Sequence, residues 1–161
     1  FLIQRYGFTE SNTGNFFAYV GIWIAITQVL ITPRVSRLWK ERNIIAFALL
    51  GTGSAILLYL LPGPWTIMLV TTPIFAVFNG LVGANYLSFL SRSAGREVQG
   101  EVLGINSSVY ALAQAIPPML AGFIAAQTRA ESTLLVASGI IVAGGVLFLC
   151  TVRKDPEAVA I

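Results

Sequence analysis

Amide side chains inside apolar segments are the groups of this sequence with the clearest chemical potential. The hydrophobic stretch over residues 95–126 contains Asn106 and Gln114, and the apolar run before it contains Asn79. An amide surrounded by hydrocarbon leaves its hydrogen-bonding groups unpaired, so such a residue normally faces another helix or a watery cavity. These side chains could therefore bind polar groups of a solute or join helices to one another.

Residue types used for catalysis and metal binding are scarce. The 161 residues include no histidine and one cysteine, Cys150, which lies in an apolar run. The chain by itself can therefore build neither a disulfide nor a Cys/His metal cluster, and we expect no metal and no cofactor. No acidic residue lies well inside an apolar run, and without a histidine base an intramembrane hydrolase is disfavoured. We expect no enzyme activity.

Composition indicates an integral membrane protein. Hydrophobic residues make up 56% of the chain and charged residues 11%, whereas about 25% of an ordinary soluble domain is charged. The net charge of +3 comes from basic residues dispersed between apolar runs, without the basic face that binds nucleic acid. The lipid bilayer is therefore the expected partner, and nucleic acid is not.

Five apolar segments are long enough to cross a bilayer as helices, which takes about 20 residues each. They cover residues 13–31, 44–61, 65–90, 98–126 and 133–151, and a tail follows at 152–161. The connections between them are short. We expect residues 1–161 to form one all-α, multi-pass transmembrane bundle.

Basic residues are distributed unequally between the two sides that these spans define. Arg5 and Arg129 lie on one side, and eight of the ten basic residues lie on the other: Arg34, Arg37, Lys40, Arg42, Arg92, Arg96, Arg153 and Lys154. Cytoplasmic loops carry the excess of Lys and Arg in membrane proteins. The larger set, and with it the C-terminal tail, is predicted to be cytoplasmic.

The amides also separate the spans into two groups. They are Asn15 and Gln28 in the first span, Asn79 and Asn85 in the third, and Asn106 and Gln114 in the fourth. The first, third and fourth spans are therefore predicted to line an interior, and the second and fifth to face lipid. The alternative for each amide is a hydrogen bond between neighbouring helices, worth about 1 kcal/mol. Tyr19 and Tyr110 could stack on an aromatic solute or anchor a helix at the membrane interface.

Two stripes of residues separate around the fourth predicted span when it is projected at about 100° per residue. Small residues at four-residue spacing let two helix backbones approach closely, which predicts a helix contact along one stripe. That stripe contains Gly100, Gly104, Ser108 and Gly122. The other stripe is polar and contains Asn106, Tyr110, Gln114 and Pro117.

The segment QGEVLGINSSVYALAQAIPPMLAG resembles the eleventh helix of major facilitator superfamily transporters, especially the drug/proton antiporter branch that includes tetracycline efflux pumps. The matching positions are Gln99, Gly100, Gly104, Ser107, Ser108, Pro118 and Gly122. The segment YGFTESNTGNFFAYVGIWIAITQVLITPRVSRLWKER is similar to the end of helix seven, helix eight and the following cytoplasmic loop of that family. Arg37 and Arg42 match basic positions of the loop motif, although no Asp precedes Arg37. With Arg34 they are candidates for a latch at the inner helix ends.

The resemblance implies helices eight to twelve of a twelve-helix transporter, the C-terminal half, whose N-terminal half is missing from this chain. It implies proton-coupled efflux of a drug-like or small organic molecule by alternating access, in a bacterial inner membrane, with the substrate between the two halves. Sugar or metabolite uptake by the same fold, and a non-transporting membrane scaffold subunit, remain open alternatives. The candidate cavity residues are Asn15, Tyr19, Asn79, Asn106, Tyr110 and Gln114.

Overall fold

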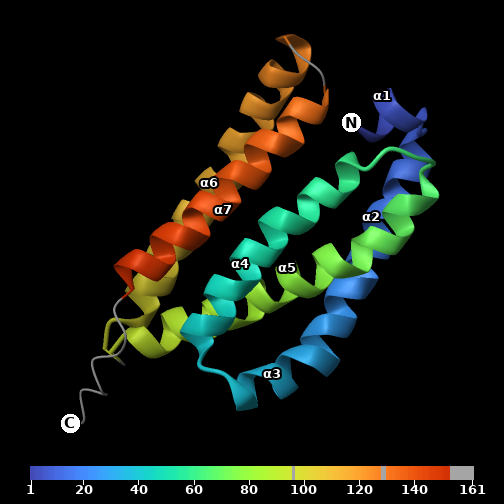
Figure 1. Ribbon diagram of the computed structural model, residues 1–161. Helices are drawn as coiled ribbons and strands as arrows, with labels where there is room; N and C mark the ends of the chain where they lie inside the picture. The colour runs from blue at the N-terminus through green and yellow to red at the C-terminus, as the bar shows by residue number, and fades with distance from the viewer. Residues whose placement is uncertain (96, 128–129, 153–161) are drawn as a thin grey trace.

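Helices account for all the regular structure in the residues that the computed structural model describes, 1–95, 97–127 and 130–152 (Figure 1). In chain order they are α1 (Leu2–Tyr6), α2 (Glu10–Ile26), the π-helical η1 (Thr27–Ile31), α3 (Thr32–Leu38), α4 (Glu41–Leu57), the 3-10 turn η2 (Leu58–Leu60), α5 (Thr66–Ser93), α6 (Gln99–Gln127) and α7 (Ala130–Thr151). The predicted all-α fold of a multi-pass membrane bundle is confirmed.

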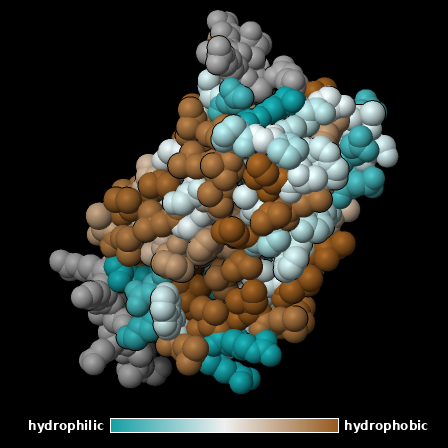
Figure 2. Space-filling view, turned by 45° about the vertical axis from the view of Figure 1, so that its right-hand side comes forward, coloured by the Kyte–Doolittle hydropathy of each residue, from teal (hydrophilic) through white to brown (hydrophobic). Residues whose placement is uncertain are grey.

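Four helical segments within the described ranges are long and apolar enough to cross a membrane. They are Glu10–Leu38, Glu41–Leu60, Thr66–Ser93 and Glu131–Thr151. α6 has 29 residues and contains most of the predicted fourth span, including its amides and prolines. The exact membrane boundaries within these helices stay predictions. Figure 2 shows apolar side chains over much of one face of the bundle and hydrophilic side chains gathered near its ends.

The first long helix continues from α2 through η1 into α3. It begins where the side chain of Thr9 accepts a hydrogen bond of 3.2 Å from the backbone N–H of Asn12, a common N-cap arrangement. At η1 it crosses α5 closely, because Thr27 is fully buried and a Cβ added to Gly80 would lie 3.0 Å from the Thr27 Cβ. The π-helical turn ends at Ile31, two residues before Pro33, which cannot donate a backbone hydrogen bond.

The tightest packing of the bundle surrounds α4, which contacts α5 and α7 (Figure 1). Half of its apolar window, 50%, is buried, against 11% for Glu10–Leu38 and 11% for Glu131–Thr151. Ile44 and Ala48 form a core cluster with Leu81 of α5. The prediction that the second span is a lipid-facing helix is therefore wrong for about half of its surface. Its lack of amides reflects apolar helix neighbours as well as lipid.

α6 lies at the edge of the bundle, where it packs against α7 and the end of α5 (Figure 1). Its side chains are exposed almost continuously from Gly104 to Leu120. Near its start, the Gln99 amide donates hydrogen bonds to the backbone oxygen and the hydroxyl of Ser91 on α5. α6 is thus attached at its beginning and along one side only.

Candidate transport surface

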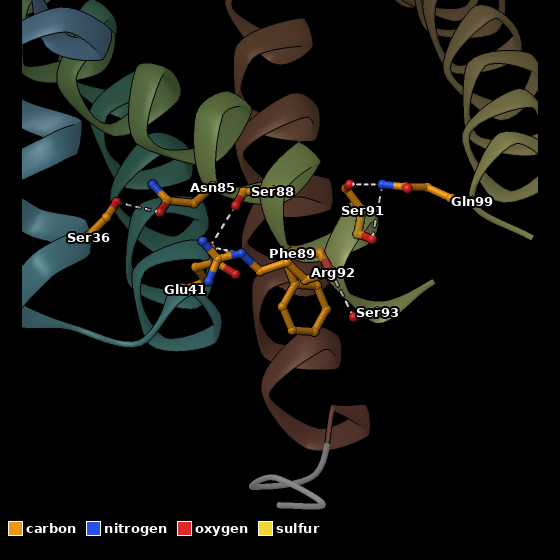
Figure 3. Close-up of polar contacts among 9 residues, drawn as sticks. All are labelled: Ser36, Glu41, Asn85, Ser88, Phe89, Ser91, Arg92, Ser93 and Gln99. Carbon is orange, nitrogen blue, oxygen red and sulfur yellow. Dashed lines mark hydrogen bonds and ion pairs between the residues drawn. The ribbon is translucent and has the colours of Figure 1, made fainter. Parts of the chain in front are cut away.

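The amides that the sequence singles out differ in their surroundings, and Asn85 is the most enclosed. It is 2% exposed, and its Nδ2 donates a hydrogen bond of 2.8 Å to the backbone oxygen of Leu81. The Ser36 hydroxyl donates to Asn85 Oδ1 at 2.9 Å, which joins α3 to α5 (Figure 3). This geometry supports a hydrogen bond between helices as the role of Asn85, and not contact with a solute.

Asn15 and Tyr19, two of the candidate cavity residues, are brought together in a pocket of about 550 Å³. The pocket lies where α2 and α5 begin, and its other lining residues are Tyr6, Gly7, Phe8, Asn12, Phe16, Trp65 and Leu69. The Tyr19 hydroxyl donates a hydrogen bond of 2.9 Å to the backbone oxygen of Leu69, which fixes the ring across the two helices.

Aromatic rings form much of the wall of this pocket. The rings of Phe8 and Trp65 meet edge to face, with 6.1 Å between centroids and 72° between planes, and Tyr6 lies 6.1 Å from Phe8. The lining residues include amides and aromatics and no charged side chain. Such a surface suits an aromatic, hydrogen-bonding solute better than an ionic one. Sequence reasoning missed Phe8 and Trp65 as lining residues, because only the tertiary contact brings them together.

The polar stripe of α6 faces away from this pocket's walls. Asn106 Oδ1 accepts a hydrogen bond from the Tyr86 hydroxyl of α5, while Tyr110 is 60% exposed and Gln114 is also exposed. Asn79, on α5, is half-buried. None of these four side chains lines the aromatic pocket, so the structure separates the candidate cavity residues into two surfaces, and their contact with a solute stays a prediction.

The small-residue stripe of α6 has no described helix against it. A Cβ added at Gly100, Gly104 or Gly122 would have no described atom within 4 Å outside its own helix backbone. Ser108 donates a hydrogen bond of 3.2 Å to the backbone oxygen of Gly104, within the same helix. The predicted helix contact along this stripe therefore stays a prediction for a surface beyond the described residues.

The three candidate latch arginines have different environments. Arg42 donates from Nε to the Val152 backbone oxygen at 2.6 Å and from Nη2 to the Leu149 backbone oxygen at 3.0 Å. It therefore joins the start of α4 to the carbonyl groups at the end of α7, which a cationic side chain stabilises. Arg34 donates to the Leu30 backbone oxygen in its own helix, and Arg37 is exposed at a second pocket.

The carboxylates of the described residues lie at or next to helix starts. Glu10, Glu41, Glu101 and Glu131 each occupy a first helical turn, and Glu97 precedes α6. Glu41 Oε1 accepts a hydrogen bond of 2.6 Å from the Ser88 hydroxyl and pairs with Arg92 Nε at 3.5 Å (Figure 3). No described carboxylate lies in the middle of a candidate span, where a proton-coupling group would be placed.

The long apolar helices define the class of this molecule as a multi-pass helical membrane protein. A family model described as Major Facilitator Superfamily matches residues 1–160. The chain therefore belongs to the Major Facilitator Superfamily, a family of membrane transporters.

The chain is similar to two curated relatives whose names refer to drug resistance. It is 31% identical over 125 residues to Multidrug resistance protein 1 of Bacillus subtilis (strain 168). This aligned region covers 77% of this chain and 32% of that protein. It is 30% identical over 130 residues to Quinolone resistance protein NorA of Staphylococcus aureus (strain Mu50 / ATCC 700699). This aligned region covers 80% of this chain and 33% of that protein. The chain thus spans about a third of the length of these relatives. No solved structure matches it significantly.

Proposed function

We propose that this chain forms one wall of the substrate pathway in a secondary transporter that exports drug-like organic molecules by alternating access. Its membership of the Major Facilitator Superfamily supports the transporter class. The names of two relatives, which refer to multidrug and quinolone resistance, support a drug-like organic substrate. The chain spans about a third of those proteins, and our proposal assigns the rest of the pathway to an N-terminal half.

The observation that carries this proposal is the open polar stripe of α6. Tyr110 and Gln114 are exposed in the middle of α6, a long and predominantly apolar helix. In hydrocarbon an uncovered amide is unfavourable by several kcal/mol. A second helical bundle across a water-filled pathway removes that penalty, since substrate sites of secondary transporters lie between two bundles near the midplane.

Proton coupling is assigned to the N-terminal half. Coupling requires a group that titrates inside the membrane, and the described carboxylates of this chain all lie at helix starts. The chain therefore supplies amides and aromatic rings to the pathway, while an acidic residue of the other bundle carries the proton.

The orientation of the chain follows from its charges. Eight of its ten basic residues fall on the side that includes the end of α3 and the C-terminal tail. The positive-inside rule favours the cytoplasmic side for these residues, and the bacterial sources of the relatives favour a bacterial inner membrane. The aromatic pocket at the start of α2 and α5 then opens to the outside.

Transport by the full-length protein in inverted membrane vesicles tests the proposed function. We expect proton-driven uptake of a quinolone, with Gln114→Ala raising KM several-fold. Leu112→Ala is a matched control, because Leu112 is equally part of α6 and 60% exposed but lies on the opposite side of the helix, about 200° away. Uptake no greater than in vesicles without the transporter, or equal effects of the two substitutions, would exclude the proposal.

A further inference from the structure

A second pocket, of about 770 Å³, lies at the other end of α5 from the aromatic pocket. Its lining comes from the end of α3, the start of α4 and the end of α5, and it includes four cationic side chains: Arg37, Lys40, Arg42 and Arg92. This composition is the reverse of the aromatic pocket, whose lining has no charged group. A pocket of this kind attracts an anion.

Glu41, the carboxylate among the described residues of this lining, is already engaged. It accepts the hydrogen bond from Ser88 at 2.6 Å and pairs with Arg92 at 3.5 Å (Figure 3). Two nitrogens of Arg42 are held by carbonyl groups of α7. The described lining residues comprise four basic side chains and one carboxylate. Basic side chains therefore outnumber carboxylates among the described lining residues.

Arg37 and Arg92 have side chains that can reach a ligand. Arg37 is exposed, and neither ion pair among the described residues includes it. Arg92 is 78% exposed even though its Nε faces Glu41. A guanidinium group presents several N–H donors in one plane, which matches the oxygens of a phosphate group.

Exposed apolar side chains border the cationic lining. Leu38 is 81% exposed and Trp39 is 52% exposed. The Trp39 ring meets Phe47 of α4 edge to face at 5.7 Å, and Phe47 is itself 53% exposed. Tryptophan is enriched at the membrane–water interface, where apolar and polar surroundings meet. The cations thus lie beside a surface that can contact acyl chains.

We propose that this pocket binds the phosphate of an anionic phospholipid headgroup, with Arg37 as the main contact and with Leu38, Trp39 and Phe47 along the acyl chains. Basic pockets between helices on the cytoplasmic side of membrane proteins bind such headgroups. The bound lipid would connect the ends of α3, α4 and α5. This site is separate from the transport pathway and does not depend on the proposed function.

The fluorescence of Trp39 reports occupancy of the site. The chain has three tryptophans, so Trp23→Phe and Trp65→Phe leave Trp39 as the only one. The protein is placed in phosphatidylcholine bilayers for two titrations. One adds increasing fractions of brominated phosphatidylglycerol, and the other adds brominated phosphatidylcholine. In both lipids the bromine atoms lie near the glycerol end of the acyl chains. We expect brominated phosphatidylglycerol to quench Trp39 fluorescence at a lower lipid fraction than brominated phosphatidylcholine does.

Two substitutions distinguish a site from a general surface charge. Arg37→Gln is expected to lower the preference for phosphatidylglycerol about fivefold, the effect of one cationic side chain at an anionic membrane surface. Arg34→Gln is the matched control, because Arg34 is an exposed arginine of the same short helix but does not line the pocket. An equal decrease in the two variants would reveal a diffuse surface potential and overturn the site.

Two further arms complete the test. Excess inorganic phosphate should leave the preference for phosphatidylglycerol unchanged. If phosphate abolished this preference, the pocket would be assigned to a free anion and the lipid proposal would be overturned. Native mass spectrometry on the chain with all three tryptophans provides an independent measurement. Phosphatidylglycerol should remain bound to the unsubstituted and Arg34→Gln forms and be lost from Arg37→Gln; equal retention by all three would contradict the proposal.

Discussion

The seam between α4 and α7 and the small-residue stripe of α6 carry the same sequence signal, yet only the first is packed in this structure. A Cβ added to Gly53 of α4 would lie 2.6 Å from Val142 Cγ2 and 3.2 Å from the Ser138 backbone oxygen, both on α7. A Cβ added to Gly104 of α6 would meet no described atom within 4 Å. Small residues therefore permit close helix contact but do not determine whether a partner is present.

The seam also contains a buried hydrogen bond, which the stripe lacks. Ser138, 4% exposed, donates to the Gly53 backbone oxygen at 2.7 Å across the two helices. Ser108 of the stripe donates within its own helix. Because lipid is as apolar as a helix surface, association in the membrane depends on close packing and on such interhelical bonds. The seam is a completed contact, and the stripe is a surface available to another bundle.

The largest effect is expected for Gly53→Leu. The new side chain would overlap Val142 and the α7 backbone, so we expect the free energy of unfolding in mixed micelles to fall by up to about 3 kcal/mol. Gly144→Leu is the matched control on α7, because a Cβ there meets nothing within 4 Å. If both substitutions lowered stability equally, the result would contradict close packing of α4 against α7 at Gly53.

Gly104→Leu tests whether the stripe has a partner outside the described residues. In this chain alone we expect a change below about 0.5 kcal/mol, as for a surface substitution. In the full-length transporter we expect a loss of about 2 kcal/mol or a lower folded yield, because a second bundle would cover the stripe. Leu112→Ala should be tolerated in both. Equal tolerance of Gly104→Leu in the full-length protein would remove the packing hypothesis.

Cysteine accessibility compares the polar stripe of α6 with apolar positions of α4 and α7. After Cys150, which is exposed, is replaced by Ser, single cysteines at Asn106 and Gln114 should react with a hydrophilic thiol reagent in the full-length protein. We expect them to react roughly tenfold faster than cysteines at Leu57 and Val142, because thiolate formation requires water. Protection of all four positions would favour the membrane scaffold over the transporter.

The smallest effect is expected for Ser138→Ala. Removing its bond to Gly53 should lower the free energy of unfolding by about 0.6 kcal/mol, the average for interhelical hydrogen bonds in a membrane protein. Ser54→Ala is a suitable control, since Ser54 is exposed and donates within its own helix to Leu50. A larger loss for Ser54→Ala than for Ser138→Ala would show that the seam gains nothing from this bond.

Apolar length and composition were sufficient to predict the class of fold, because a membrane-spanning backbone must satisfy its own hydrogen bonds and a helix does so locally. The ordered motifs of α6 and of the α2 to α3 region were sufficient to indicate the family. These properties depend on residues that are close together in the sequence. They were accessible without knowledge of any long-range contact.

Only the tertiary structure decided which neighbour each side chain meets. Asn85 and Asn15 are both amides in apolar helices. Asn85 accepts a hydrogen bond from Ser36, whereas Asn15 lines an aromatic pocket. Likewise Arg42 contacts the far end of α7, and α4 is buried although it has no amide in its apolar run. The physical reason is that lipid and apolar helices are equivalent surroundings for a hydrophobic side chain. Sequence periodicity therefore specifies a helix and its faces, while the chain's long-range packing specifies what each face contacts.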